Sequence, residues 1–258
     1  MDLDAALKKK FAVSKKDEQQ LVSSIRKYFH GAGKKKAVIG ISGGVDSALV
    51  CYLACKALGP QNVFAYHLPY VQNERDGRDA ENLAKMLGAN FKQIDIRRAV
   101  DTLTDTYKPS TRIASGNIRV RARMMALFTF AHMHEGLVIG TGNRTELLLG
   151  YFTKFGDGGC DVLPIGNYYK TQVWEMAKLS GLPEHIINKV PSAGMWEGQT
   201  DEKEIGVTYS EIDKILCAHF DLKLGWDKLE NYFKAEKVQR IAELNGKSGH
   251  KRSMPQIL

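Results

Sequence analysis

Cysteine is scarce in this sequence, with four residues in a chain of 258. Four cysteines are too few for a disulfide framework at this length. Cys51 and Cys55 lie four residues apart in a segment with the pattern of a buried helix. We therefore expect these thiols to belong to the core rather than to a redox or metal site.

Long hydrophobic runs are also missing. No stretch reaches the roughly 18 apolar residues of a membrane-spanning helix, and the opening segment MDLDA is acidic rather than apolar. A signal peptide is therefore not predicted, and we expect a cytoplasmic protein without a membrane partner. Internal repeats, low-complexity tracts and linkers are absent as well, so we predict a single domain over residues 1–258.

Acidic residues are in the minority, with 29 against 37 basic ones and a formal net charge of +8. Aromatic residues are not interleaved with the lysine clusters, and no DNA- or RNA-binding signature accompanies them. His132 and His134 cannot share a helix face as zinc ligands. Small anionic substrates account for the charge, so we predict no nucleic-acid partner. The densest clusters are Lys8-Lys9-Lys10, Lys15-Lys16 and Lys34-Lys35-Lys36.

The stretch AVIGISGGVDSALVCYLA, residues 37–54, has the pattern of a strand, a glycine turn and a helix. Residues 37–41 are apolar and short, as in a parallel strand buried on both faces. Apolar residues then recur at helical spacing over residues 48–58. A turn in this position directs bare N–H groups and the positive end of a helix dipole outward, so we predict that it binds an anion.

Of two simple interpretations of this turn, the sequence excludes one and leaves the other open. A phosphate loop of the GxxxxGK[ST] type is excluded, because Val45 and Asp46 follow the last glycine in place of lysine and serine or threonine. A tight βα turn, with Asp46 as a helix cap and no ligand, stays open.

Two functional patterns fit the same turn. GxSxG, from Gly40 to Gly44, is the nucleophile elbow of α/β-hydrolases; Ser42 would be the nucleophile, with Asp201 and His250 later in the chain. SGGxDS, residues 42–47, is a pyrophosphate loop, in which hydroxyls donate to phosphate oxygens and a carboxylate holds Mg²⁺. The second pattern is favoured, because it also explains Asp46.

The rest of the first half alternates strand and helix. Repeated βα units predict a doubly wound parallel sheet with helices on both faces and ligands at the carboxyl ends of its strands. Both glycine-rich turns, at residues 42–44 and 140–142, fall at such ends. The further elements that we expect are strands at 63–68, 91–96 and 137–141 and helices at 78–87 and 117–135.

Three motifs together resemble the ammonia-dependent NAD synthetases: SGGVDS at 42–47, GTGNRTE at 140–146 and TKFGDGGCD at 153–161. The likeness covers about residues 20–256 and implies a fold of the adenine nucleotide alpha-hydrolase type. SGGxDS alone also occurs in tRNA-thiolating enzymes, but the cysteines and RNA-binding module expected of those are not found. The likeness continues through residues 164–165, Lys170, 191–193, 198–202 and 250–252.

The resemblance implies a two-step amidation, the last step of NAD biosynthesis. The carboxylate of deamido-NAD (nicotinic acid adenine dinucleotide) attacks the α-phosphorus of ATP and releases pyrophosphate, and ammonia then displaces AMP to give NAD. Mg²⁺ is the implied cofactor. Activation is needed because a carboxylate has no good leaving group, whereas AMP leaves readily.

The resemblance also implies residue roles. Asp46 and Glu146 would bind Mg²⁺, and Lys170 would act with them in catalysis. The implied ATP-binding residues are Gly40, Ile41, Ser42, Gly43, Gly44, Val45, Asp46, Ser47, Thr141, Lys170 and Ser192, and the implied deamido-NAD-binding residues are Arg121, Lys154, Asp161, His250 and Lys251.

Three further expectations concern the surroundings of the site. The chain has no room for the glutaminase domain of the glutamine-dependent relatives, so ammonia is the predicted nitrogen donor. Residues 194–204, rich in Gly, Asp and Glu, are the expected closing loop. A homodimer is expected from the family and from one helix that is apolar on more than one face, through Met124, Met125, Leu127, Phe128, Phe130 and Met133.

Overall fold

The computed structural model describes residues 2–71, 73–192, 194, 196, 198–253 and 257. A parallel sheet is built from the β-branched and aromatic segments predicted to be strands, in the order β3-β2-β1-β4. Its strands all run in the same direction, which confirms the predicted parallel α/β class. The strands are β1 (Ala37–Gly40), β2 (Val63–His67), β3 (Asn90–Gln93) and β4 (Leu137–Val138).

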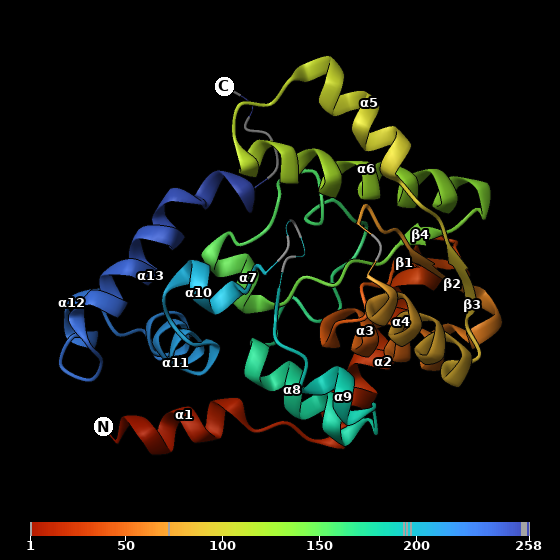
Figure 1. Ribbon diagram of the computed structural model, residues 1–258. Helices are drawn as coiled ribbons and strands as arrows, with labels where there is room; N and C mark the ends of the chain where they lie inside the picture. The colour runs from red at the N-terminus through yellow and green to blue at the C-terminus, as the bar shows by residue number, and fades with distance from the viewer. Residues whose placement is uncertain are drawn as a thin grey trace.

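Helices cover both faces of the sheet (Figure 1). Along β1, Ala37 and Ile39 pack with helices α2 and α3, whereas Val38 packs on the other face with α6. This alternation is the two-residue period of a strand. The helices on the first face are α2 (Lys15–Gly31), α3 (Val45–Leu58) and α4 (Glu74–Leu87); those on the second are α5 (Arg97–Tyr107) and α6 (Arg112–Met133).

A second hydrophobic cluster lies in the helical part of the chain, around the fully buried Ile212, Ile215 and Leu216 of α11. Trp174 packs against both this cluster and the core beneath the sheet. The single domain over residues 1–258 stays a prediction. The remaining elements are α1 (Leu3–Phe11), α7 (Arg144–Leu149), α8 (Lys170–Leu179), α9 (Glu184–Ile187), α10 (Asp201–Ile205), α11 (Tyr209–Phe220), α12 (Trp226–Leu229), α13 (Ala235–Lys247) and the 3₁₀ turns η1 (Pro60–Asn62) and η2 (Gly249–Lys251).

Element boundaries differ from the sequence expectations at several points. Helix α4 begins at Glu74, four residues before the predicted start, because Asn73 accepts hydrogen bonds from the backbone N–H groups of Arg75 and Asp76. Helix α5 was not predicted at all. The predicted strand at 137–141 pairs over β4 only and continues as a single bridge from Ile139 to Val162.

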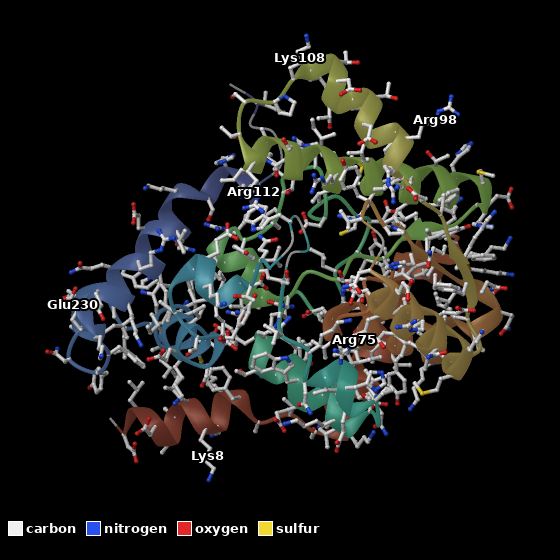
Figure 2. The ribbon with its side chains drawn as sticks, viewed as in Figure 1. Lys8, Arg75, Arg98, Lys108, Arg112 and Glu230 are labelled. Atoms are coloured by element: carbon white, nitrogen blue, oxygen red, sulfur yellow. The ribbon has the colours of Figure 1, made fainter. Side chains whose placement is uncertain are left out.

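The charged side chains are spread over separate elements. Figure 2 shows Lys8 on α1 at one end of the molecule, and Arg98 and Lys108 on and beside α5 at the other. Among the described residues, no helix has the length and apolarity needed to cross a membrane.

Candidate active site

The turn after β1 is folded around two serine hydroxyls. Ser47, which is buried in the first turn of α3, donates a hydrogen bond from Oγ to the carbonyl of Gly44 at 3.0 Å and accepts one from the backbone N–H of Ser42 at 3.2 Å. The Ser42 hydroxyl lies 3.2 Å from that of Ser47 and accepts from the N–H of Gly44 at 3.2 Å. The loop therefore closes on itself at the N-terminus of a helix, where an anion is favoured.

Gly43 is required at the tip of this loop. Its φ of +81° lies in the left-handed region, which side chains with a Cβ rarely adopt. A Cβ there would also come within 2.9 Å of the backbone oxygen of Asp76 in α4. The loop and the first turns of α4 are thus in close contact.

Asp46 brings three distant parts of the chain together at the carboxyl end of β1. Its carboxylate forms an ion pair with the Lys170 ammonium at the start of α8 and accepts a hydrogen bond from the Asn143 amide at 2.9 Å. Lys170 and Asn143 are both buried. β1 and β4 are neighbours in the sheet, so the two glycine-rich turns meet as expected at their carboxyl ends.

Glu146 is the second carboxylate of this cluster. Its Oε2 accepts from the backbone N–H of Asn143 at 3.0 Å, and the Asn143 side chain accepts from the N–H of Glu146 at 3.0 Å, which is a capping box at the start of α7. Removal from water, followed by repulsion from Asp46, raises the pKa of Glu146 to about 8 from its ordinary 4.5. A bound cation would relieve this strain.

Lys170 and Asp201 are two further charged residues that act on Glu146. Burial alone would lower the pKa of Lys170, but the attraction of Asp46, Glu146 and Asp201 raises it, so the lysine stays cationic. Asp201, at the start of α10 and 4% exposed, accepts a hydrogen bond from the Tyr209 hydroxyl at 2.9 Å. Sequence reasoning assigned Asp201 to the hydrolase alternative, and its place beside these groups was missed.

Asp213 is a second residue that sequence reasoning missed. It is completely buried on α11 and accepts from Thr145 Oγ1 at 2.5 Å and from Thr171 N and Oγ1 at 2.8 Å each. Thr145 in turn accepts from the backbone N–H of Lys170 at 2.9 Å. Because Thr145 precedes Glu146 and Lys170 precedes Thr171, this network fixes the starts of α7 and α8 relative to each other. The sequence signal was a lone aspartate on an apolar helix.

Four of the five residues implied for deamido-NAD lie in contact with one another or with the same loop. Arg121 on α6 donates to the Lys154 carbonyl at 3.3 Å, and the Lys154 ammonium donates to the His250 carbonyl at 2.7 Å. Lys251 donates to the carbonyls of Gly150 and Phe152 at 2.7 and 2.9 Å, and burial lowers its pKa. These contacts place basic groups from three segments around residues 150–154.

The fifth residue, Asp161, has a different environment. Its carboxylate accepts from the backbone N–H of Val138 at 2.7 Å, and its own N–H donates to the Val138 carbonyl at 2.9 Å. Asp161 therefore extends the edge of the sheet beside β4. In this structure its carboxylate is therefore hydrogen-bonded to the backbone.

Thr141 and Ser192 are placed more loosely. Thr141 is half-buried just beyond β4, and Ser192 is exposed and accepts from the N–H of Gly194 at 3.1 Å. The backbone N–H of Asp201, inside the predicted closing segment 194–204, donates to the carbonyl of Pro191, three residues before that segment, at 3.1 Å. Within that segment, Met195 and Glu197 lie outside the described residues, as does Ala193 just before it.

The hydrolase interpretation finds no support in this geometry. The Ser42 hydroxyl contacts Ser47 and the N–H of Gly44, neither of which is a base. His250 contacts Lys154 through its carbonyl. An activated serine needs a histidine within hydrogen-bond reach, and the described contacts of Ser42 provide none.

A parallel α/β sheet whose first strand ends in a serine- and glycine-rich turn, with a carboxylate–lysine cluster beside it, is the arrangement expected of an ATP-binding ligase. The comparisons with known proteins specify it further. The sequence model of the NAD synthase family matches residues 18–255, so the chain belongs to the NAD synthase family. The predictions of an NAD synthetase and of its fold are confirmed.

Individual relatives match over nearly their whole length. The "NH(3)-dependent NAD(+) synthetase" of Pyrococcus horikoshii is 45% identical over 242 residues, 93% of this chain and 94% of that protein. An NMN synthetase structure from Francisella tularensis has a TM-score of 0.86 at 38% identity and covers 96% of this chain and 99% of its own. The NH3-dependent NAD synthetase of Campylobacter jejuni, in complex with nitrate, has a TM-score of 0.82 at 31% identity, with 96% and 100% covered.

Proposed function

We propose that this chain amidates deamido-NAD with ammonia in two chemical steps. First, a carboxylate oxygen of deamido-NAD attacks the α-phosphorus of ATP, the bond from that phosphorus to the bridging oxygen breaks, and pyrophosphate leaves. Second, ammonia attacks the activated carbonyl carbon, loses a proton, and expels AMP to leave NAD. The observation that carries this proposal is the Asp46–Lys170–Glu146 cluster beside the loop at residues 42–47.

The loop residues would bind the polyphosphate of ATP. The Ser42 hydroxyl and the N–H of Gly43 would be donors, at the positive end of α3. The Ser47 hydroxyl and the N–H of Gly44 would donate to the polyphosphate by exchanging the hydrogen bonds that they make within the loop. Gly40, Ile41 and Val45 would contact ATP through the backbone around this turn. The Lys170 ammonium would stabilise the negative charge that develops on the leaving pyrophosphate. Thr141 and Ser192, from two other segments, would contribute hydroxyls to the ATP site.

Asp46 and Glu146 fit a Mg²⁺ ion. Both offer carboxylate oxygens, the ligand type that Mg²⁺ prefers, and the raised pKa of Glu146 reflects carboxylates crowded together in a poorly hydrated place. When bound, the ion would neutralise the charge on the polyphosphate. The ion pair with Asp46 holds Lys170 in position. Asn143 donates from its side-chain amide to Asp46 and from its backbone N–H to Glu146, and so fixes the two carboxylates relative to each other.

The basic group formed by Arg121, Lys154, His250 and Lys251 fits the anionic diphosphate of deamido-NAD. The cationic ends of Arg121, Lys154 and Lys251 converge around residues 150–154, where each donates to a neutral backbone carbonyl. Asp161 would join them only if its carboxylate left the Val138 N–H.

Ammonia, rather than glutamine, is the proposed nitrogen donor. Hydrolysis of glutamine in the larger relatives needs an activated cysteine. Burial raises the pKa of Cys160 to about 11 and that of Cys217 to about 12, and Cys51 and Cys55 are buried in α3. A thiolate nucleophile is therefore not favoured at Cys160 or Cys217, and burial keeps Cys51 and Cys55 away from a substrate in solution.

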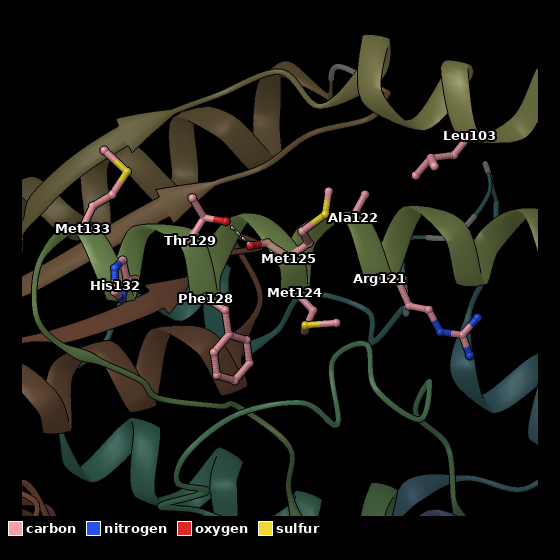
Figure 3. Close-up of a pocket in the computed structure, with 9 residues that line it drawn as sticks. All are labelled: Leu103, Arg121, Ala122, Met124, Met125, Phe128, Thr129, His132 and Met133. Carbon is pink, nitrogen blue, oxygen red and sulfur yellow. Dashed lines mark hydrogen bonds between the residues drawn. The ribbon is translucent and has the colours of Figure 1, made fainter.

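A homodimer through α6 is also part of the proposal. Leu127 and Phe130 of this helix pack inward on the core, whereas Met125, Phe128 and Met133 are exposed by 54%, 37% and 69%. A second copy of the chain would bury this apolar face. The exposed face belongs to a groove of about 690 Å³ (Figure 3) lined by Leu103, Arg121, Ala122, Met124, Met125, Phe128, Thr129, His132 and Met133.

Release of pyrophosphate from ATP with a panel of carboxylic acids tests the proposed substrate. Deamido-NAD should stimulate release, and simple acids such as nicotinic acid should not. Nicotinic acid mononucleotide belongs in the panel, because the Francisella tularensis structure is described as an NMN synthetase. A kcat/KM for the mononucleotide above that for deamido-NAD would contradict the proposal.

A further inference from the structure

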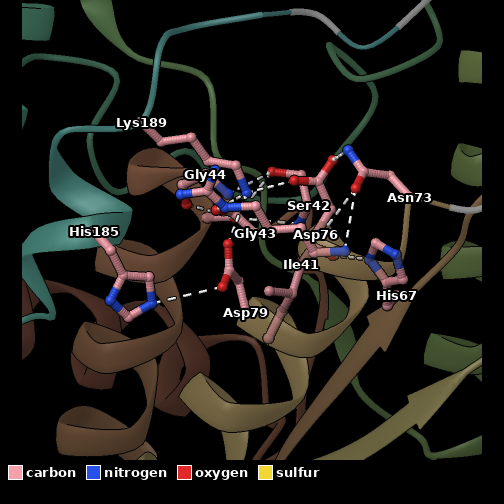
Figure 4. A network of polar contacts seen from close by, with 12 residues as sticks. Ile41, Ser42, Gly43, Gly44, His67, Asn73, Asp76, Asp79, His185 and Lys189 are labelled. Atoms are coloured by element: carbon pink, nitrogen blue, oxygen red, sulfur yellow. Dashed lines mark hydrogen bonds and ion pairs between the residues drawn. The ribbon is translucent and has the colours of Figure 1, made fainter.

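Lys189 lies over the glycine loop although it comes from a segment 146 residues further along the chain. Its ammonium donates a hydrogen bond to the Gly43 carbonyl at 3.1 Å and pairs with Asp79 at 3.0 Å. It also forms an ion pair with Asp76. Figure 4 shows Lys189 reaching from the end of α9 to these groups.

Helix α4 holds this ammonium in place. Asp76 and Asp79 are three residues apart and so share one face of the helix. Asp79 is buried and also lies 3.5 Å from the His185 ring, while the Asp76 backbone contacts Gly43 closely. The lysine side chain is only 23% exposed, so a cation is held at a defined point beside the loop.

The contact with Gly43 fixes the orientation of a peptide group. A peptide unit is planar, and its C=O and N–H point in opposite directions. Holding the Gly43 carbonyl toward Lys189 therefore turns the N–H of Gly44 to the other side, where it meets the Ser42 hydroxyl at 3.2 Å. The donors available to an anion in this loop depend on that orientation.

We propose that Lys189 is a positioning residue for the polyphosphate of ATP: it holds the Gly43–Gly44 peptide so that the N–H of Gly44 fixes the oxygen of the Ser42 hydroxyl, one of the loop's donors to the anion. This inference rests on the proposed function of the loop. The ammonium acts through Gly43 and needs no contact with the substrate. Asp76 and Asp79 fix the lysine and moderate its charge.

Lys189→Met removes the ammonium while keeping a long side chain, and Lys189→Arg restores a cation. Lys178→Met is the matched control, because Lys178 is exposed on α8 and pairs only locally with Glu175. Because the Gly43 peptide would lose its charged partner, the KM for ATP and the Ki for inorganic pyrophosphate should both rise about tenfold or more in Lys189→Met. The KM for deamido-NAD should stay within about twofold, and Lys189→Arg should recover most of the loss.

Three results would overturn the inference. The Ki for pyrophosphate could stay unchanged in Lys189→Met, the KM values for ATP and deamido-NAD could rise equally, or the melting temperature could fall with no change in either constant. A wild-type protein that does not bind pyrophosphate would instead contradict the proposed role of the loop. The two failures are therefore distinguishable.

Should Lys189→Met not fold, Asp79→Asn supplies the test. It removes the charge of one of the two carboxylates that fix the lysine, while Gly43 and Asp76 remain as partners. The ammonium would then be held less firmly against the Gly43 carbonyl, so the Ki for pyrophosphate should rise by about twofold or more. An unchanged or lower Ki would contradict the positioning role.

Discussion

Lys170 and Asp46 form an ion pair at the carboxyl end of β1 although 124 residues separate them in the sequence. The lysine is 3% exposed, and so depends on its carboxylate partners for its charge. Removing one partner of a buried ion pair is strongly destabilising. Asp46→Asn is therefore expected to reduce stability as well as activity, and Glu146→Gln is the cleaner probe of the proposed metal site.

Glu146→Gln should abolish adenylation. The amide keeps an oxygen to accept from the N–H of Asn143, so the capping box survives while the negative charge is lost. Mutation of residues that hydrogen-bond to metal ligands lowers metal affinity or activity by about 10- to 100-fold. Loss of a ligand itself should therefore reduce the rate of pyrophosphate release by more than about a hundredfold. The control is Glu175→Gln on the exposed face of α8; near-wild-type release by Glu146→Gln would exclude the ligand role.

The stability of the metal-free protein should fall as the pH rises from about 5 to 8. The folded protein holds a proton on Glu146 up to a pKa of about 8, whereas the unfolded chain loses it near the ordinary 4.5. The folded state thus binds more protons in this window, and the free energy of unfolding should decrease by up to ~1.4 kcal/mol per pH unit. Urea unfolding with a chelator, in wild type and Glu146→Gln, measures this. If the free energy of unfolding depended on pH in the same way in both proteins, the raised pKa of Glu146 would be contradicted.

The α6 face should control the oligomeric state. Met125→Lys places a charge on the exposed apolar face and should give a monomer by light scattering at micromolar concentration. Met86→Lys is the matched control, because Met86 is a similarly exposed methionine on α4, at 53%. A monomeric wild type, or a Met125→Lys variant that remains dimeric, would refute this interface.

Much of the fold could be predicted from sequence, because it depends on local patterns. The turn at residues 42–47 and the strands at 37–41 and 63–68 follow from apolar runs, glycines and β-branched residues. Helix α5 was missed because its apolar positions are few, and only Val100 on it is buried. Its apolar residues nevertheless lie on one face at helical spacing, so the amphipathic period was present in the sequence.

The cluster around Asp46 and Glu146 could be predicted only from the motifs and their resemblance to a family. The side chains that contact the segments around this cluster and the neighbouring loop were not identified. Asp213 contacts Thr145 and Lys189 contacts Gly43, and the members of each pair are 68 and 146 positions apart in the sequence. No local spacing rule connects such positions. Their roles depend on which helix ends the tertiary fold brings together.

The nitrogen donor can be tested with isotopic label. NAD formed in the presence of ¹⁵N-ammonium should carry the label, and NAD formed with amide-labelled glutamine should not. Because NH₃ rather than ammonium is the nucleophile, NAD formation at fixed total ammonium should speed up as the pH rises from mildly acidic to mildly basic. Label entering NAD from glutamine, with purified protein and no free ammonia, would contradict the ammonia-dependent assignment.

Transfer of ¹⁸O tests the central claim most directly. Deamido-NAD labelled with ¹⁸O in both carboxylate oxygens would be converted with ATP and ammonia, and the products analysed by mass spectrometry. Attack of the carboxylate on the α-phosphorus predicts one ¹⁸O in AMP, one in the amide of NAD and none in pyrophosphate. AMP without label, or label in pyrophosphate or inorganic phosphate, would contradict the adenylated intermediate and with it the proposed function of this site.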